Sequence, residues 1–320
     1  MTVPTTMRAV VMDRFGPPDV LHLTEVPVPR PGRGEVLVRV HAAGVNAIDW
    51  LSRAGGLART AAFPMVLGWD ISGVVAASGP DVSSLREGDE VFGMIRFPEL
   101  AGGYAEYVSA PAEQLVAKPG TVDHRTAAGT PMAGITAWQA LFRQAQVTQG
   151  QQVLVHGAAG GVGHVAVQLA KLAGARVVAT ASARNHAFLA SLGVDQTIDY
   201  TSQPIERSAA GLDVVLEPRG GADFHALAGS LRPGGIIVTL KGEQPDYRQR
   251  LAALGVRAGY VYVSPDREAL TDIARHLGSG ELKIYIDRVL PLDQAAVAHA
   301  TGERGHVRGK LVLDVTDRNA

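Results

Sequence analysis

A glycine-rich loop lies between an apolar run and a run with helical spacing, and its own spacing is typical of a phosphate-binding turn. The stretch "VLVHGAAGGVGHVAVQ" places Ala158, Gly160 and Gly163 in the three slots of G-x-G-x-x-G. The tight turn, the approach of a pyrophosphate and the packing of helix on strand each require a small residue there. A phosphate is therefore expected at the helix start near Gly161 and Val162, where unpaired N–H groups and the helix dipole favour an anion. The alternative is a turn that binds nothing.

The tip of the next expected strand, "VVATASARN", distinguishes between the two nicotinamide dinucleotides. An NAD site usually has an acid there for the ribose 2′-hydroxyl, but no acid occurs between Gly163 and Asp195. Ser182 and Arg184 stand at this tip instead. Because hydroxyl and guanidinium groups bind a 2′-phosphate that a carboxylate would repel, NADPH is the predicted cofactor. The alternative is that Arg184 is a solvated residue at a helix start.

Composition narrows the class of protein. The chain has 320 residues, which predicts one large or two medium domains. Its net charge of −1, with no block of like charges, argues against nucleic acid or an anionic membrane as partner. The absence of cysteine excludes disulfides, thiolate catalysis and Cys-ligated zinc. No signal peptide or membrane-spanning apolar run is apparent, so a cytoplasmic location is expected.

The pattern of the elements that must position these residues changes along the chain. Short apolar or alternating runs between Gly, Pro and Asp clusters predict a β-rich domain over residues 1–124. Further on, strands alternate with helices, which indicates βαβ units and a parallel sheet. The predicted fold is α/β, with a Rossmann doubly wound parallel sheet over 125–287. A final apolar strand is expected to return to the first domain, so residues 288–320 are assigned to it.

Motifs along nearly the whole chain match one known family. They are, in order, "AAGVNAIDW", "LGWDISGVV", "GDEVFG", "GGYAEYV", "AGITAWQAL", "AAGGVGHVAVQLAKLAGARVVATAS", "LRPGGIIV" and "GHVRGKLVL". This set resembles the zinc-free quinone oxidoreductase branch of the medium-chain dehydrogenase/reductase superfamily. The resemblance implies a GroES-like catalytic domain at the N-terminus, an active site in the cleft between it and the Rossmann domain, and a homodimer built through the coenzyme domains.

The resemblance also shows where the chain departs from the zinc alcohol dehydrogenases of that superfamily. Those enzymes carry a cysteine ligand at the position of Asn46 and a histidine ligand at that of Trp69. Zinc needs three or four converging donors. The remaining candidates are Asp49, Asp70 and His41, of which Asp49 is expected to cap a turn and Asp70 to lie next to a strand. No metal site is therefore predicted.

A site without zinc has lost the Lewis acid that alcohol oxidation needs. Hydride can still pass to a quinone or an α,β-unsaturated carbonyl when the protein supplies orientation, a dry pocket and a hydrogen-bond donor. The resemblance implies that Asn46 is this polar group, and an asparagine in a tight turn is the alternative. Trp50 and Trp69 are expected to form an aromatic wall for a flat acceptor, or else to pack in the core. Tyr104 and Tyr107 are expected in a strand.

Further cofactor contacts follow from the resemblance. It implies that Thr136 contacts the nicotinamide side and that Tyr200 lies near the adenosine phosphate. It also implies that the strand at Tyr262 and Val263 meets the carboxamide through backbone groups. Arg308 is a second candidate for the charge of the cofactor, with a surface turn as the alternative.

The predicted function is an NADPH-dependent reductase that transfers hydride to a quinone, a small-molecule electron acceptor, without zinc. One alternative is an NADPH-dependent enone or enoyl-thioester reductase, which must also protonate the α-carbon. The other is a non-catalytic NADPH-binding protein. A serine hydrolase is excluded because no G-x-S-x-G occurs.

Overall fold

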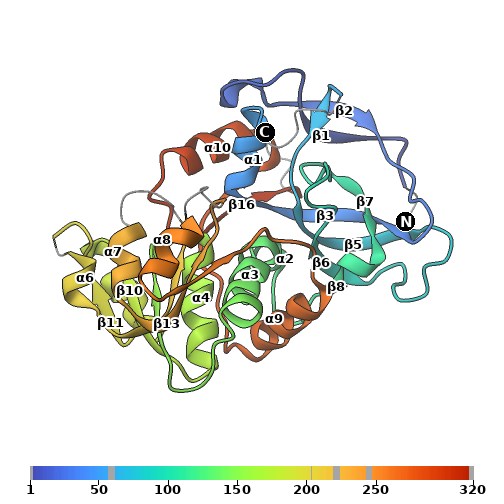
Figure 1. Cartoon of the computed structure of the whole chain (residues 1–320). Helices are drawn as coiled ribbons and strands as arrows, with labels where there is room; N and C mark the ends of the chain where they lie inside the picture. The colour runs from blue at the N-terminus through green and yellow to red at the C-terminus, as the bar shows by residue number, and fades with distance from the viewer. Residues whose placement is uncertain (1–2, 57–61, 203, 219–223, 243–246, 317–320) are drawn as a thin grey trace. The chain divides into compact units, whose positions relative to one another are not determined.

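The computed structural model divides the chain into two compact units (Figure 1). Unit 1 comprises Met1–Ile135 and Ser264–Ala320, and unit 2 comprises Thr136–Val263. The structure describes residues 3–56, 62–202, 204–218, 224–242 and 247–316. Unit 1 is therefore built from two separate stretches of sequence, whereas unit 2 is continuous.

Unit 1 is a β-rich unit made mainly of antiparallel pairs. One sheet has the strand order β2-β1-β4, and a larger one has the order β15-β16-β3-β5-β6-β8, with β7 also paired to β3. The strands are β1 (Thr6–Met12), β2 (His22–Pro27), β3 (Glu35–Val45), β4 (Met65–Val66), β5 (Asp70–Ser78), β6 (Glu90–Met94), β7 (Tyr107–Pro111), β8 (Val116–Ala117), β15 (Ile286–Pro291) and β16 (Lys310–Asp314). The β-rich domain predicted from the alternating runs is confirmed.

The last strand of the chain completes the sheet that the early strands begin. β16 pairs antiparallel with β3, with Leu311 opposite Val45, and parallel with β15. In Figure 1 the red β16 accordingly lies beside the blue β3. The predicted return of the final apolar strand is confirmed, because every residue of β16 is buried in this unit.

Helices cover parts of this sheet and extend unit 1 beyond the predicted boundaries. They are α1 (Ala47–Arg53), α2 (His124–Ala128), α9 (Arg267–Ser279) and α10 (Ala295–Glu303), while α3 (Pro131–Trp138) begins in unit 1 and ends in unit 2. α2 contacts β3 and β5, and α9 contacts β8. Residues 125–135 and 264–287, which the sequence assigned to the Rossmann domain, therefore pack with unit 1.

Unit 2 holds a parallel sheet with the strand order β11-β10-β9-β12-β13-β14. Its strands are β9 (Gln152–Val155), β10 (Arg176–Thr180), β11 (Gln196–Ile198), β12 (Leu212–Glu217), β13 (Leu231–Thr239) and β14 (Arg257–Tyr260). Its helices are α4 (Gly161–Leu172), α5 (His186–Ser191), α6 (Ile205–Ser208), α7 (Phe224–Gly229) and α8 (Tyr247–Ala253). In chain order this is 3-2-1-4-5-6, the doubly wound Rossmann arrangement, so the predicted fold is confirmed.

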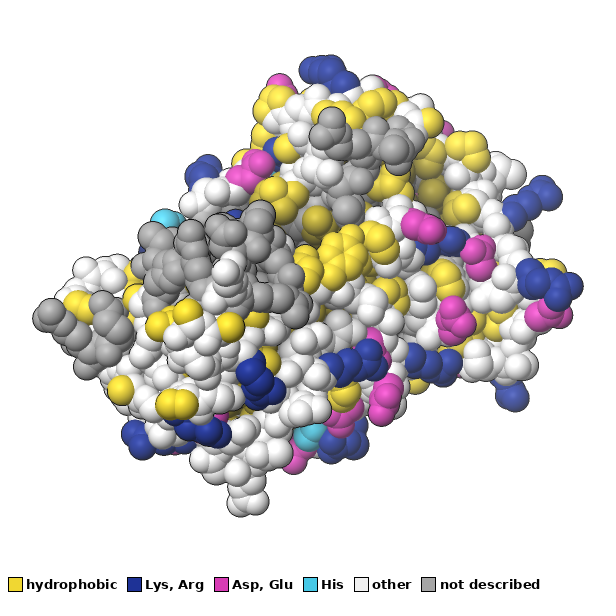
Figure 2. Space-filling model, viewed as in Figure 1, with side chains coloured by type: hydrophobic (Ala, Val, Ile, Leu, Met, Phe, Trp, Pro, Cys, Tyr) yellow, Lys and Arg dark blue, Asp and Glu magenta, His cyan; other side chains and the backbone are white. Residues whose placement is uncertain are grey.

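The surface shows no preference for one sign of charge on the face seen in Figure 2, where basic and acidic side chains are interspersed. The chain carries 30 Lys and Arg against 31 Asp and Glu, which agrees with that mixture. Within the described ranges, every helix is too short or too polar to span a lipid bilayer.

Gly44 is expected to be essential for the junction of β3, β5 and β16. It lies opposite Asp70 in β5, and a Cβ atom built on it would lie 2.3 Å from the carbonyl oxygen of Ala128 in α2. Replacement Gly44→Ala should therefore lower the free energy of unfolding by about 1–3 kcal/mol, as overpacking of a core does. Chemical denaturation measures the change. Gly120→Ala is the control, since nothing lies within 4 Å of its Cβ position. Equal stability of the two variants would contradict the close packing.

Candidate active site

The glycine loop joins β9 to α4 and presents a helix amino terminus without a side-chain cap among the described residues. Gly160 is the N-cap residue, and Gly160, Gly161 and Val162 are half-buried while Gly163 is buried. The first N–H groups of a helix have no intrahelical partner, so they can bind an anion when no side chain occupies them. The exposed part of the loop therefore fits a phosphate.

The buried part of the loop explains its small residues. A Cβ atom on Gly163 would lie 2.6 Å from the carbonyl oxygen of Gly157 and 2.7 Å from the Cα of Ala158. Gly157 itself has φ of +64°, the left-handed region that favours glycine. Ala158 is completely buried, so alanine in the first slot is compatible with the turn. These contacts explain why small residues occupy the loop.

Thr180, the last residue of β10, ties the loop to the neighbouring strand tip. Its hydroxyl accepts from the N–H of Gly157 at 3.1 Å and contacts Nδ1 of His156 at 2.8 Å. Its carbonyl oxygen accepts from the N–H of Ala158 at 3.0 Å. Because Ser182 follows two residues later, the structure brings the loop and the predicted 2′-phosphate residues to the same edge of the sheet.

The strand tip carries the residues expected to choose between cofactors. Ser182 precedes the short 3₁₀ helix η4 (Ala183–Asn185) and is half-buried, and Arg184 within it is exposed. Tyr200 follows β11 on the adjacent strand, and its ring lies 6.2 Å from that of His156. Ser182, Arg184 and Tyr200 thus cluster near the glycine loop, whereas their contacts with a cofactor stay predictions.

The other predicted cofactor residues are more scattered. Thr136 is buried in α3, Tyr262 is exposed and Val263 is half-buried beyond β14. Arg308 belongs to unit 1, and its guanidinium lies over the ring of Tyr285 at 5.8 Å from the centroid. The roles of these residues stay predictions.

The second group of candidate residues lies in unit 1, where strand register brings distant segments together. Asn46 directly follows β3, Asp70 begins β5 and Lys310 begins β16. Gly44 pairs with Asp70, and Val45 pairs with Leu311, so these three polar residues meet at one end of the sheet. All are buried, with exposed fractions of 7% for Asn46, 0% for Asp70 and 4% for Lys310.

Hydrogen bonds hold both ends of the Asn46 side chain. Its Nδ2 donates to Oδ2 of Asp70 at 2.9 Å, and its Oδ1 accepts from the ammonium of Lys310. The backbone N–H of Met132 donates to the other oxygen of Asp70 at 3.0 Å, and Lys310 also donates to the carbonyl of Val45 at 3.1 Å. The amide is therefore fixed between a carboxylate and an ammonium.

Asp49 is a buried carboxyl in the first turn of α1. Its Oδ2 accepts from the backbone N–H of Asn46 at 2.7 Å, which forms the capping box that begins the helix. Its Oδ1 is buried. Burial, with a smaller contribution from the charge of Asp70, raises the pKa of Asp49 from 3.8 to about 7. The turn-capping role predicted for Asp49 is confirmed.

The charges of this cluster balance when one of its carboxyls keeps a proton. Burial raises the pKa of Asp70 to about 6, while the charge of Lys310 counteracts that increase. Burial lowers the pKa of Lys310, and both carboxylates counteract that decrease. Because Lys310 stabilises the ionised form of Asp70 most directly, we assign the retained proton to Asp49.

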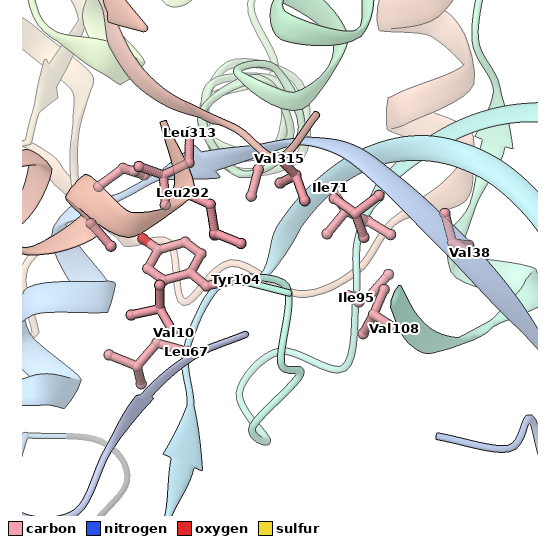
Figure 3. Close-up of a cluster of buried hydrophobic side chains, with 14 of the residues drawn as sticks. Val10, Val38, Leu67, Ile71, Ile95, Tyr104, Val108, Leu292, Leu313 and Val315 are labelled. Carbon is pink, nitrogen blue, oxygen red and sulfur yellow. The ribbon is translucent and has the colours of Figure 1, made fainter. Parts of the chain in front are cut away.

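Tyr104 extends the cluster into the hydrophobic core. It has no exposed surface, and Figure 3 shows its ring between Val10 and Leu67 on one side and Leu292 on the other. Its hydroxyl lies 3.3 Å from Nε2 of His299. Burial, and then the charge of Asp49, raise its pKa. Tyr104 lies between β6 and β7 and not in a strand as predicted.

His299 connects this tyrosine to a buried arginine. Burial, and to a smaller extent the charge of Arg53, lower the pKa of His299 to about 3, so the ring is neutral. Arg53 lies 3.4 Å from its Nδ1 and donates to Glu303 at 2.6 Å. The predicted strand position of Tyr107 is confirmed, because it begins β7.

The two tryptophans differ in their surroundings. Trp69 has no exposed surface, its indole N–H donates to the carbonyl of Glu99 at 2.6 Å, and Phe97 packs edge-on against it. Trp69 therefore does not form an accessible aromatic wall, and it packs in the core. Trp50 is half-buried and its ring lies against Gly302 of α10.

The donors in this part of unit 1 do not fit a zinc ion. The oxygen of Asn46 accepts from Lys310, whose ammonium repels a second cation at that place. Trp69 offers an N–H donor and no lone pair. The ring of His41 packs against His124, with centroids 4.2 Å apart. Across the described residues, no group of three or more His, Cys, Asp or Glu side chains is arranged to hold a metal ion.

A Rossmann unit with a pyrophosphate loop, joined to a β-rich unit with a buried polar centre, defines a nicotinamide-dependent oxidoreductase. Two family models match the chain. The model for the alcohol dehydrogenase GroES-like domain matches residues 32–120, and the model described as zinc-binding dehydrogenase matches residues 192–313.

Curated relatives and solved structures extend the match over nearly the whole chain. NADPH-dependent alkenal/one oxidoreductase of Arabidopsis thaliana is 33% identical over 98% of this chain and 80% of its own length. Quinone oxidoreductase of Mus musculus is 31% identical over 96% of this chain and 97% of its own length. The structure of the quinone oxidoreductase from Coxiella burnetii is 38% identical, with a TM-score of 0.89 over 97% and 99% of the two chains. The chain belongs to the quinone oxidoreductase branch of the medium-chain dehydrogenase/reductase superfamily, as the resemblance predicts.

Replacement Asp49→Asn should change how stability depends on pH. The raised pKa means that folding stabilises the protonated carboxyl, and this contribution is present below pH 3.8 and lost as the pH rises to about 7. Asparagine does not ionise and keeps an oxygen for the N–H of Asn46. The variant should therefore gain stability relative to the parent protein across this range. Urea unfolding at a series of pH values measures the difference.

Asp293→Asn provides the control, because Asp293 is exposed in the short helix η5 (Leu292–Gln294). Its stability should run parallel to that of the parent protein. A parallel curve for Asp49→Asn as well would show that folding does not change the pKa of Asp49 and would contradict the assignment of the proton.

Proposed function

We propose that the protein is an NADPH-dependent quinone reductase that works without zinc. The observation that carries this proposal is the centre formed by Asn46, Asp70 and Lys310, in which an ammonium and a carboxylate hold the Asn46 amide. By the resemblance, Asn46 stands where the zinc enzymes of the superfamily carry a cysteine ligand. Such a centre suits an acceptor that is already electron-poor, because it can orient and hydrogen-bond a carbonyl but provides no Lewis acid. The homodimer and the cytoplasmic location stay predictions of the sequence.

Different residues of the chain would bind the cofactor and orient the acceptor. The glycine loop and the start of α4 bind the pyrophosphate, and Ser182 and Arg184 bind the 2′-phosphate. The bound nicotinamide supplies the hydride. Asn46 would orient the acceptor through a hydrogen bond to its carbonyl oxygen.

The second candidate is reduction of an enone, which the alkenal/one oxidoreductase among the relatives favours. Enone reduction must place a proton on the α-carbon. Tyr104, the tyrosine nearest to this centre in the hydrogen-bond network, has no exposed surface and contacts His299. A hydroquinone takes its protons on oxygen, where water can supply them, so the buried tyrosine favours a quinone as acceptor.

Turnover of NADPH with 1,4-benzoquinone and with 2-alkenals tests the proposal. We expect oxidation of NADPH, followed by its absorbance, to be faster with the quinone. Dialysis against a chelator should leave the rate unchanged, because the donors around Asn46 do not fit zinc. A faster reaction with alkenals would favour the enone reductase. Tight NADPH binding without turnover of any acceptor would indicate a non-catalytic protein.

Replacement Arg184→Ala tests the choice of cofactor. Loss of a charge-assisted contact with the 2′-phosphate should weaken NADPH binding about tenfold or more and leave NADH binding unchanged. Fluorescence titration with both cofactors gives the ratio of affinities. Arg176→Ala is the control, since Arg176 is an exposed arginine that begins β10, at the end opposite Ser182. An unchanged ratio in Arg184→Ala would remove the phosphate role of this residue.

A further inference from the structure

We propose that Asp70 and Lys310 are positioning residues that hold the amide of Asn46 in one orientation, with one N–H left to donate to a carbonyl oxygen of the acceptor. This inference rests on the proposed function and deepens it. It assigns a direction to the hydrogen bond and names the two residues on which that direction depends.

The charges on either side of the amide allow only one orientation. An ammonium has donors and no lone pair, and a carboxylate has lone pairs and no donor. Lys310 must therefore face Oδ1 of Asn46, and Asp70 must face Nδ2. A flipped amide would place its NH₂ against the ammonium and its oxygen against the carboxylate, which loses two charge-assisted hydrogen bonds in a buried place.

The fixed orientation leaves one hydrogen for a ligand. The NH₂ group of an asparagine has two hydrogens, and one of the two goes to Asp70. None of the other described residues is recorded as accepting the second. Asn46 as a whole residue keeps 7% of its surface exposed, and the proposal requires that a ligand reach this hydrogen through that exposed part. The oxygen, in contrast, is already engaged by Lys310.

The positioning residues are themselves held in place. The second oxygen of Asp70 accepts from the backbone N–H of Met132 at the start of α3, and Lys310 also donates to the carbonyl of Val45. Both residues begin strands whose register with β3 is fixed on either side of Asn46. A donor that is held in advance of the reaction needs no reorganisation when charge develops.

The direction of this hydrogen bond suits the chemistry of a quinone. When a quinone takes a hydride from the nicotinamide it gains two electrons, and negative charge forms on a carbonyl oxygen until a proton from water neutralises it. An N–H donor stabilises that charge, whereas an amide oxygen would repel it. Lys310 adds to the effect, because its positive charge lies behind the amide oxygen.

The test compares variants of the positioning lysine. Lys310→Met should lower kcat for 1,4-benzoquinone about 10- to 100-fold, as misplacement of an aligned group does. The Kd of NADPH should stay unchanged, because the glycine loop lies in unit 2. Lys310→Arg keeps the charge and should recover part of kcat. Lys118→Met is the matched control, because the side chain of Lys118 is also buried and forms an ion pair with Glu90. The kcat of this variant should equal that of the parent protein.

A second measurement reports on the amide directly and does not depend on turnover. The chain has three asparagines, Asn46, Asn185 and Asn319, so labelling with ¹⁵N-asparagine gives few side-chain NH₂ resonances, and Asn46→Ala identifies the relevant pair. In the parent protein the two hydrogens of Asn46 should differ strongly in chemical shift, since one faces a carboxylate. In Lys310→Met the pair should shift and broaden as the amide becomes free to rotate. Lys118→Met should leave it unchanged.

These measurements separate the inference from the function on which it rests. An unchanged Asn46 pair together with unchanged kcat in a folded Lys310→Met variant would overturn the positioning role. Loss of NADPH binding along with kcat would also overturn it, because that pattern indicates a general structural defect. If the parent protein turns over no acceptor, the proposed function fails, and the NH₂ resonances still decide whether Lys310 orients the amide.

Discussion

The arrangement of unit 1 depends on the buried contact of Lys310 and Asp70 with the two ends of the Asn46 amide. An ammonium and a carboxylate inside a protein are costly unless hydrogen bonds satisfy them. Here every partner comes from a different element, namely β16, β5, the start of α3 and the residue between β3 and α1. The same contact that neutralises the charges therefore also fixes how these elements meet, and it couples the stability of the sheet to the geometry of the proposed site.

The same contact bears on Asn46, which by the resemblance stands where zinc enzymes of the superfamily carry a metal ligand. In this chain the positive charge near Asn46 comes from a lysine that is part of the fold. A lysine provides hydrogen bonds and charge at fixed positions, but it does not accept a lone pair from a substrate oxygen as a metal ion does. Under the proposed function, the acceptor must therefore be a molecule whose own electronic structure accommodates the hydride.

Sequence reasoning succeeded where the pattern is local. The loop from Ala158 to Gly163 lies between a strand and a helix that are its immediate neighbours, and the βαβ alternation after it predicts the Rossmann sheet directly. The polar centre is different, because Lys310 and Asn46 are 264 residues apart and meet only through the pairing of β16 with β3. The sequence left open whether Trp69 packs in the core, and it did not predict the burial of Tyr104, since neither residue lies in a periodic run. The cofactor contacts expected from the resemblance depend on groups outside the chain.

The split of unit 1 has a consequence for synthesis on the ribosome. Unit 2 is continuous and can fold as it emerges, because a domain needs only its own residues. β3 and β5 emerge long before β16, the strand that lies against β3 and carries the lysine. The nascent chain must therefore keep the β3 edge and the Asp70 carboxyl without their final partner throughout translation of the intervening domain.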